Sequence, residues 1–171
     1  MSEPESALRV EITALRRQTG AVRTVRAEVT LSDLEVTTAR VREGRVRVDV
    51  TIENVIEGMV ARGVLLAVCD GECRRCLETV SVDLDIEVRE IFELHPTEGE
   101  TWPISDDHVD LEPMVRESIL LALPLTPLCR DDCLGPHPER FPTMTAADAD
   151  EAAEPAIDPR WAALDELELD E

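Results

Sequence analysis

Two short cysteine pairs are the residues of this chain best suited to chemistry. Cys73 and Cys76 form a C-x-x-C in the stretch CDGECRRC, and Cys129 and Cys133 form a C-x-x-x-C in PLCRDDC. Zn2+ prefers four soft ligands in a tetrahedron, and two such pairs supply them if the fold brings them together. Because four cysteine ligands leave no coordination position open for a substrate, the pattern predicts a structural zinc site.

Residues near the pairs extend this prediction. Arg74 and Arg75 lie between the first two cysteines, where we expect them to offset the negative charge of a tetrathiolate site and to lower the pKa values of its thiols. Cys69 has the same strand parity as Cys73 and is a reserve ligand, although such a cysteine is more often a small core residue. His137, in the segment GPHP, is the other reserve ligand.

The thiols have other uses that stay open at this point. Unliganded thiols need no partner, and a C-x-x-C also occurs in redox-active proteins, so zinc buffering or redox sensing is the alternative function. A thioredoxin-like site needs a βαβ pattern, which this region lacks. The chain also has no G-x-S-x-G, P-loop or G-x-G-x-x-G, and its histidines lie in polar, proline-rich stretches. We therefore expect neither an enzyme nor a small-molecule substrate.

The elements that must position the cysteines are mostly strands. Alternation of apolar and polar residues predicts strands over residues 8–12, 21–31, 34–41, 45–52, 60–69 and 80–89. The third and fourth of these are expected to form a hairpin around a turn at residues 42–44. The polar segment 95–107 is expected to be a loop that does not build the core.

One helix is predicted over residues 109–125. Asp110 is its expected N-cap and Pro124 its stop. Its apolar stripe comprises Leu111, Met114, Val115, Ile119 and Ala122. The expected fold is therefore α+β: a mainly antiparallel sheet or partly closed barrel with one principal helix packed on it.

Length and composition predict one domain and a tail. The chain has 171 residues, which suits a single domain over residues 1–140. Residues 141–171 are rich in Ala, Asp, Glu and Pro and are expected to be an acidic, mostly disordered tail, in which residues 159–169 can form a short helix. The chain has no sufficiently apolar window for a membrane span and no signal-peptide pattern at its start, so we expect a cytoplasmic location.

The charge of the chain limits its partners. The formal net charge is −21, from 38 acidic residues against 17 basic ones. Such a charge repels phosphate backbones and favours a basic partner protein, although an acidic surface can also serve solubility alone. Direct rRNA contact is a secondary hypothesis, through Arg45 and Arg47 in the near-neutral first third of the chain.

Several stretches, in this order and spacing, together resemble a known family. They are LRVEITALRRQTGAVR near the start, Gly63 followed by CRRCLE, the helix LEPMVRESILLALPL and then TPLCRDDC. Over about residues 8–140 the chain resembles the YceD family, the large ribosomal RNA subunit accumulation proteins of bacteria and plastids.

The resemblance implies a cytoplasmic, non-enzymatic factor that supports accumulation of large-subunit (23S) rRNA. The family's gene often adjoins that of a small zinc-ribbon protein of the large subunit, which implies binding to a basic ribosomal protein or to a precursor particle. Many members carry a further C-x-x-C after the second pair, where this chain reads LGPHPERF. Any metal must then be completed by the two pairs that are present.

Overall fold

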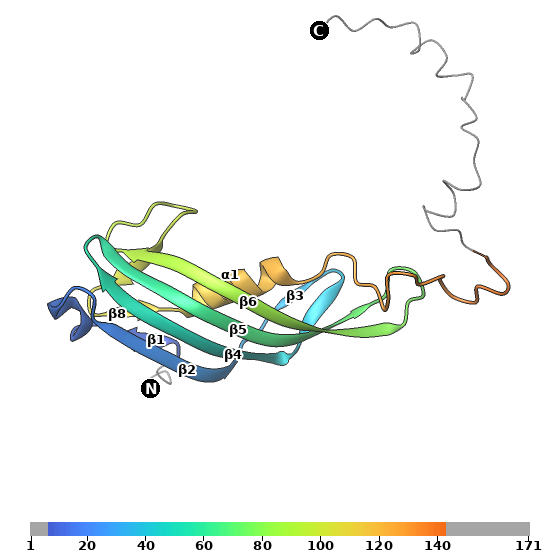
Figure 1. Cartoon of the computed structure of the whole chain (residues 1–171), viewed down its shortest axis with the longest axis horizontal. Helices are drawn as coiled ribbons and strands as arrows, with labels where there is room; N and C mark the ends of the chain where they lie inside the picture. The colour runs from blue at the N-terminus through green and yellow to red at the C-terminus, as the bar shows by residue number, and fades with distance from the viewer. Residues whose placement is uncertain (1–6, 143–171) are drawn as a thin grey trace, which may run out of the picture.

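Over residues 7–142 the protein is a curled, mostly antiparallel sheet that holds one α-helix (Figure 1). The computed structural model describes residues 7–142. The elements follow one another as β1 (Arg9–Glu11), η1 (Leu15–Arg17, a 3-10 turn), β2 (Val22–Thr30), β3 (Glu35–Val36), β4 (Ala39–Val55), β5 (Gly58–Glu72), β6 (Thr79–Glu93), β7 (Trp102–Ser105), β8 (His108–Asp110) and α1 (Glu112–Ala122).

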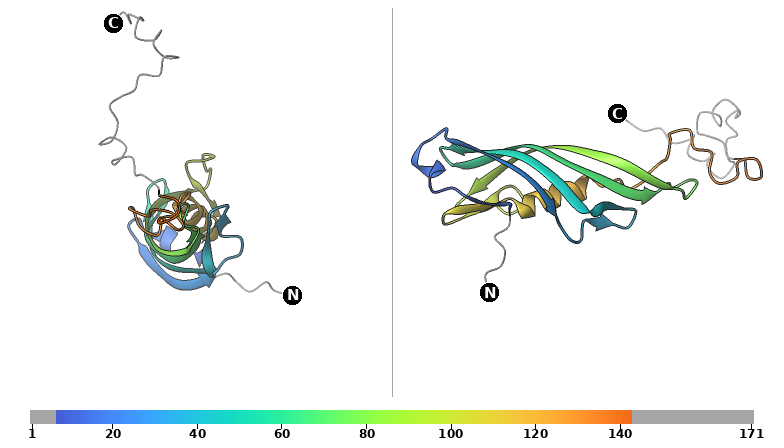
Figure 2. Two further views of the ribbon diagram at one scale, coloured as in Figure 1. Left: turned by 90° about the vertical axis from the view of Figure 1, so that its right-hand side faces the viewer. Right: turned by 90° about the horizontal axis from the view of Figure 1, so that it is seen from below.

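The strands form one sheet in the order β1-β8-β7-β6-β5-β4-β2, with β3 paired to β4. Every pairing is antiparallel except the short parallel contact between β6 and β7. Seen end-on, the sheet curls into a nearly closed barrel (Figure 2, left). Its two end strands, β1 and β2, do not pair within residues 7–142, and the Arg23 guanidinium donates to the Glu11 carbonyl at 2.9 Å between them. The predicted fold class is confirmed for this part of the chain.

The core is aliphatic and lies inside the curl. Alternate residues of β4 point inward, and Val46, Val48, Val50 and Ile52 are fully buried there. Arg45, Arg47 and Asp49 of the same strand point outward and are exposed. Because side chains alternate between the two faces of a strand, the period of two in the sequence translates directly into an apolar inner face and a charged outer face.

The helix α1 lies along the concave face of the sheet (Figure 2, right). The N-cap position is Leu111, one residue later than predicted. Asp110 still contributes to the start of the helix, because the Glu112 backbone N–H donates to Asp110 Oδ1 at 2.9 Å. The residues that α1 and the position before it bury completely are Leu111, Met114, Val115 and Ile119. Ala122, the last member of the predicted stripe, is only half-buried, because the helix ends there and Leu123 is extended.

The predicted turn at residues 42–44 is wrong. β4 continues through this segment, and its register with β5 shifts between Val41 and Val46, which identifies a β-bulge. Glu43 and Gly44 have φ values of 54° and 63°, the same left-handed conformation that a tight turn requires. The Gly44 carbonyl accepts the Leu31 N–H at 2.9 Å, so the bulge is held from the end of β2. The actual hairpin turn joins β3 to β4 at residues 37–38.

The predicted loop at residues 95–107 is also partly wrong, because it contains β7. Trp102 and Pro103 pair in parallel with the end of β6, and Ile104 pairs with Val109 of β8. Ile104 is buried and belongs to the hydrophobic core. This segment therefore joins β6 to β8 as part of the sheet.

At Gly63 the backbones of β4 and β5 lie too close together to leave room for a side chain. A Cβ atom at this position would collide with the Asp49 carbonyl oxygen and would lie 2.7 Å from Val50 Cα. Only glycine lets the two backbones come this near, which gives a physical reason for the residue. The predicted domain limits stay a prediction, and residues 143–171, with the predicted helix at 159–169, lie outside the described residues.

Candidate metal centre

The four cysteines of the two pairs meet at one end of the elongated sheet. The first pair lies in the turn between β5 and β6, at the right-hand end of Figure 1. The Cys73 N–H donates to the Glu78 carbonyl and the Leu77 N–H donates to the Cys73 carbonyl, both at 2.8 Å. Leu77 adopts a φ of 64°, so the chain turns back sharply directly after Cys76. These bonds fix both sulfurs at the tip of the hairpin.

The second pair is fastened to this tip from the segment that follows α1. The Arg74 N–H donates to the Pro127 carbonyl at 2.9 Å, which ties the two segments together before the cysteines are reached. Arg75 then reaches across, and its Nη1 donates to the carbonyls of Asp131 and Cys133 at 2.8 and 2.9 Å. The Arg75 side chain therefore acts as a clamp between the two cysteine-bearing segments.

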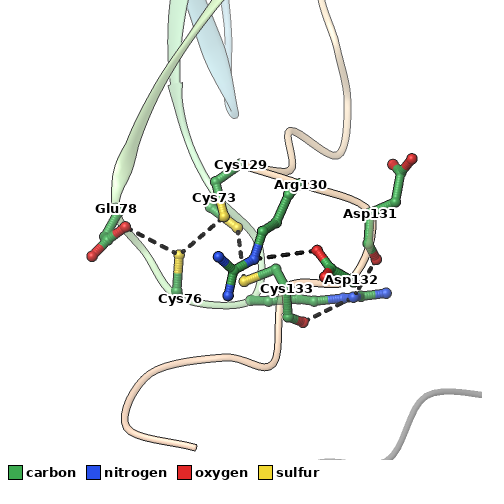
Figure 3. Close-up of polar contacts among 9 residues, drawn as sticks. Cys73, Cys76, Glu78, Cys129, Arg130, Asp131, Asp132 and Cys133 are labelled. Atoms are coloured by element: carbon green, nitrogen blue, oxygen red, sulfur yellow. Dashed lines mark hydrogen bonds and ion pairs between the residues drawn. The ribbon is translucent and has the colours of Figure 1, made fainter.

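The four sulfur atoms point toward one another (Figure 3). The Cys73 and Cys133 sulfurs are 3.9 Å apart, those of Cys76 and Cys129 are 3.7 Å apart, and all four lie within 4.8 Å of one another. A tetrahedron of sulfurs around a metal with bonds of about 2.3 Å has edges of about 3.8 Å. The sulfur spacing thus fits four thiolates around a single metal ion.

Crowding makes the acidities of these thiols unequal. The pKa of Cys73 is lowered to about 6, because the backbone N–H groups of Cys76 and Cys129 stabilise its thiolate. At Cys76 the backbone N–H of Glu78 lowers the pKa, but burial and the Cys73 thiol outweigh it and the net shift is upward. The Cys133 thiol is the main cause that raises the pKa of Cys129 to about 12. Four thiolates at this spacing repel one another, and a bound divalent metal would offset that repulsion.

The reserve ligands lie elsewhere. Cys69 is buried at 1% exposure inside the core, and burial raises the pKa of its thiol. The His137 imidazole is exposed and lies 3.3 Å from the Glu139 carboxylate. Neither belongs to the group of four sulfurs. Cys69 was a candidate because it lies an even number of residues before Cys73. In β5, however, the Cys69 side chain points inward and packs in the core.

The proposed charge-offsetting role of Arg74 and Arg75 stays a prediction. The structure shows a different role for Arg75, as a donor to backbone carbonyls, and the lowered pKa of Cys73 arises chiefly from backbone N–H groups. Sequence reasoning missed this clamp because its acceptors are carbonyls of residues 131 and 133, which carry no side-chain signal. In the sequence, only the position of Arg75 between Cys73 and Cys76 suggested a role near the cysteines.

The predicted RNA-contact arginines lie on the outer face of β4. Arg45 is within ion-pair distance of Glu28 and Glu43, and Arg47 approaches Glu28 at 4.0 Å. Their charges are therefore partly met by neighbouring carboxylates, and RNA contact through them stays a prediction.

Redox sensing by these thiols also stays a prediction, and the geometry does not favour it. A reactive cysteine needs both a low pKa and access to solvent. Cys73 has the lowered pKa but is fully buried, whereas Cys129 is exposed but has a raised pKa. Neither Cys73 nor Cys129 combines the two properties, and Cys133 is buried.

Fold and site together define a class: a small β-rich protein in which two cysteines at the tip of a β-hairpin come together with two from the segment after its helix. The sequence model of the YceD family, described as "Large ribosomal RNA subunit accumulation protein YceD", matches residues 61–168. The chain belongs to this family, as the sequence motifs predicted. The family's name implies a role in accumulation of large-subunit rRNA, and it describes an accumulation factor rather than an enzyme.

Curated relatives are similar but uncharacterised. The chain is 33% identical over 131 residues to the uncharacterised protein Rv2926c of Mycobacterium tuberculosis, which covers 70% of this chain and 60% of the relative. It is 26% identical over 168 residues to the uncharacterised protein ML1660 of Mycobacterium leprae, covering 92% and 76% of the two chains. It is 30% identical over 100 residues to the uncharacterised protein YlbN of Bacillus subtilis, covering 56% and 58%.

The match to the mycobacterial relatives covers only part of their length. The chain spans about 60% of the length of the mycobacterial relatives that match at 33% identity. No solved structure matches the chain. Within residues 7–142, no helix is long and apolar enough to cross a membrane, and the cytoplasmic location stays a prediction.

Proposed function

We propose that this protein is a non-enzymatic factor of large-subunit ribosome biogenesis that supports accumulation of 23S rRNA by binding a basic large-subunit ribosomal protein or a precursor particle. The family match over residues 61–168 carries this proposal. The net charge of −21 supports the choice of a basic partner, because opposite charge speeds encounter and selects the partner.

The proposal includes a structural zinc ion held by Cys73, Cys76, Cys129 and Cys133. Four thiolates at tetrahedral spacing are the donor set that zinc prefers, and no other described side chain contributes to the group. When bound, the metal supplies a cross-link and no open coordination position. The chain's own contribution is to present the sulfurs from two segments that α1 and the sheet already bring together.

A structural centre of this kind keeps the segment after α1 on the tip of the β5–β6 hairpin. The described part of that segment is also held by hydrogen bonds from Thr38, Arg74 and Arg75. The metal would therefore stabilise the end of the molecule without taking part in chemistry.

The function is tested by capture from lysate. The tagged full chain is used as bait at about 0.1 M salt and again at about 1 M, where the Debye length falls from about 10 Å to about 3 Å. We expect large-subunit proteins or precursor rRNA to be enriched over small-subunit components at low salt and to be lost at high salt. Depletion of the protein in cells should lower the ratio of 23S to 16S rRNA. Absence of any large-subunit enrichment, together with an unchanged rRNA ratio, would refute the proposal.

A further inference from the structure

Among the described residues, one edge of the strand β6 is paired with no other strand along most of its length, and the helix α1 packs against the same strand. β5 pairs with β6 on one side from end to end. On the other side β7 pairs only with Phe92 and Glu93, and within residues 7–142 no strand or backbone hydrogen bond covers positions 79–91 of that edge. In an edge strand, every second residue directs its N–H and C=O away from the sheet. This edge is therefore a template to which another strand can pair.

The outer face of β6 carries a row of carboxylates. Asp83, Asp85 and Glu87 are exposed at alternate positions, and Arg89 ends the row. Their cross-strand neighbours on β5 are apolar: Val68, Leu66 and Val64. On the outer face of the sheet, the row thus lies between apolar side chains of β5 and the unpaired edge of β6.

The row lacks the ion pairs that link β2 and β4, two strands that lie beyond β5 in the sheet. On β2 and β4 arginines and carboxylates face one another, as in the Arg26–Asp49 contact at 3.0 Å. By contrast, none of the three carboxylates of the β6 row makes an ion pair within residues 7–142. The Arg42 guanidinium, which pairs with Asp70, also interacts electrostatically with Asp83. Among the described residues, the row nevertheless presents three carboxylates without a direct ion pair, beside an edge whose backbone groups are unpaired.

The inward side of the same strand is apolar and incompletely covered. Leu84 and Val88 are buried, but Val82 and Ile86 are only partly buried against the core. Side chains of an added strand would alternate in the same way as those of β6. One set would lie beside the carboxylates, and the other would extend over the partly exposed apolar residues.

We propose that the free edge of β6 binds an extended segment of a partner protein as an added strand, with Arg or Lys at alternate positions beside Asp83, Asp85 and Glu87 and apolar residues between them. The inference rests on the proposed function, in which the partner is basic, and names the surface and the mode of binding. Main-chain hydrogen bonds would supply affinity, and the alternating side chains would supply specificity.

Charge argues against other occupants of this edge. Pairing with β6 of a second copy would place the two carboxylate rows side by side, which is unfavourable. Residues 143–171 of this chain are rich in Asp and Glu and contain a single arginine, Arg160. A nucleic-acid backbone would be repelled by the same row.

The probe is a synthetic peptide of about nine residues, a usual strand length, in which Arg and Val alternate. Its binding to the full chain is measured by fluorescence anisotropy. The triple variant D83N/D85N/E87Q removes the row, and the control E57Q/E98Q/E100Q removes the same charge from exposed loop positions. We expect about tenfold weaker binding to the first variant and a change of less than about twofold for the control, since cross-strand charge pairs act at short range.

Two N-methylated peptides test the strand geometry. One is methylated at the even positions and the other at the odd positions. An added strand uses only one edge of its backbone, so one of these peptides should lose binding and the other should retain it. Hydrogen exchange of amides within residues 79–91 should also slow when the unmodified peptide binds.

The outcomes separate this inference from the proposed function. Equal weakening by both triple variants, or equal binding of both methylated peptides, would overturn strand addition. The carboxylates would then serve only to prevent aggregation through the edge. If large-subunit components are captured equally by wild type and by D83N/D85N/E87Q, the proposed function stands and the inference is wrong. If the peptide results hold but no large-subunit component is captured, the inference stands and the proposed function is wrong.

Discussion

Replacement of Arg75 should weaken metal binding even when the positive charge is kept. The Arg75 guanidinium donates from Nη1 to the carbonyls of Asp131 and Cys133 at 2.8 and 2.9 Å, and so positions the second cysteine pair. A lysine ammonium is a point donor on a flexible stem and does not reproduce the planar guanidinium. We therefore expect Arg75→Lys and Arg75→Met to lose metal affinity to a similar extent.

The size of the loss follows from the two hydrogen bonds. A hydrogen bond from a charged donor contributes about 1.5–3 kcal/mol when it is well shielded, and these bonds lie at a partly exposed site, so about 1 kcal/mol each is appropriate. A total of about 2 kcal/mol corresponds to about 30-fold in affinity, which lies within the range of about 10–100-fold for residues that support metal ligands.

The assay is competition for Zn2+ between the full-length protein and a chelator of known affinity. Arg74 provides the matched control, because its guanidinium makes no hydrogen bond or ion pair within the described residues. Arg74→Met should change the affinity by less than about threefold if its charge is as exposed as the structure shows. If Arg75→Lys binds zinc like the wild type while Arg75→Met does not, the effect is one of charge and the clamp is refuted.

Two further substitutions test the fold around the site. Ile119→Ala removes a fully buried side chain of α1 and should lower the free energy of unfolding by about 3 kcal/mol, whereas Leu121→Ala, at 79% exposure, should change it by less than about 0.5 kcal/mol in the same urea titration. The hydrogen bonds from Arg42 and Ser81 lower the pKa of Asp70 to about 2. Because the folded pKa is depressed, this carboxylate stabilises the protein above about pH 4, and the stabilisation is lost as the pH falls toward about 2. Asp70→Asn should therefore lower the urea midpoint equally at pH 7 and pH 5, and the difference should narrow below about pH 4; a difference that grows in acid would contradict the assignment.

The clustering of the four cysteines could be predicted from the sequence because much of its signal is local. Each pair places two ligands within a single turn, and the strand before Cys73 and the helix before Cys129 follow from periodicity. The contact between the two pairs, by contrast, depends on residues far apart in the sequence. The approach of the segment after α1 to the β5–β6 tip depends on packing of α1 against the sheet, which no short window of sequence encodes.

The two errors in the fold have a shared physical cause. Glu43 and Gly44 adopt left-handed conformations, which serve a hairpin turn and a β-bulge equally well. The choice between them is made by pairing with β5 and by the bond from Leu31, about a dozen residues away. In the same way, the polar residues around residues 102–105 led to the prediction of a loop. In the structure these residues form β7, because they pair with the end of β6.

The free edge of β6 could not be read from the sequence. The alternation over residues 80–89 predicts a strand with one buried face, and the structure confirms it as part of β6. Whether such a strand lies inside a sheet or partly at its edge depends on where β7 begins to pair, and that is decided by the geometry of the connection rather than by the strand itself.

Metal content of the purified full-length protein tests the central claim most directly. Native mass spectrometry of reduced protein, expressed with added zinc, would compare the wild type with Cys73→Ser and Cys129→Ser, one from each pair, and with Cys69→Ala as a control from outside the group. The account predicts about one zinc per chain in the wild type and in Cys69→Ala, and none in either serine variant. Folded wild-type protein without metal, or a Cys129→Ser variant that keeps its zinc, would contradict it.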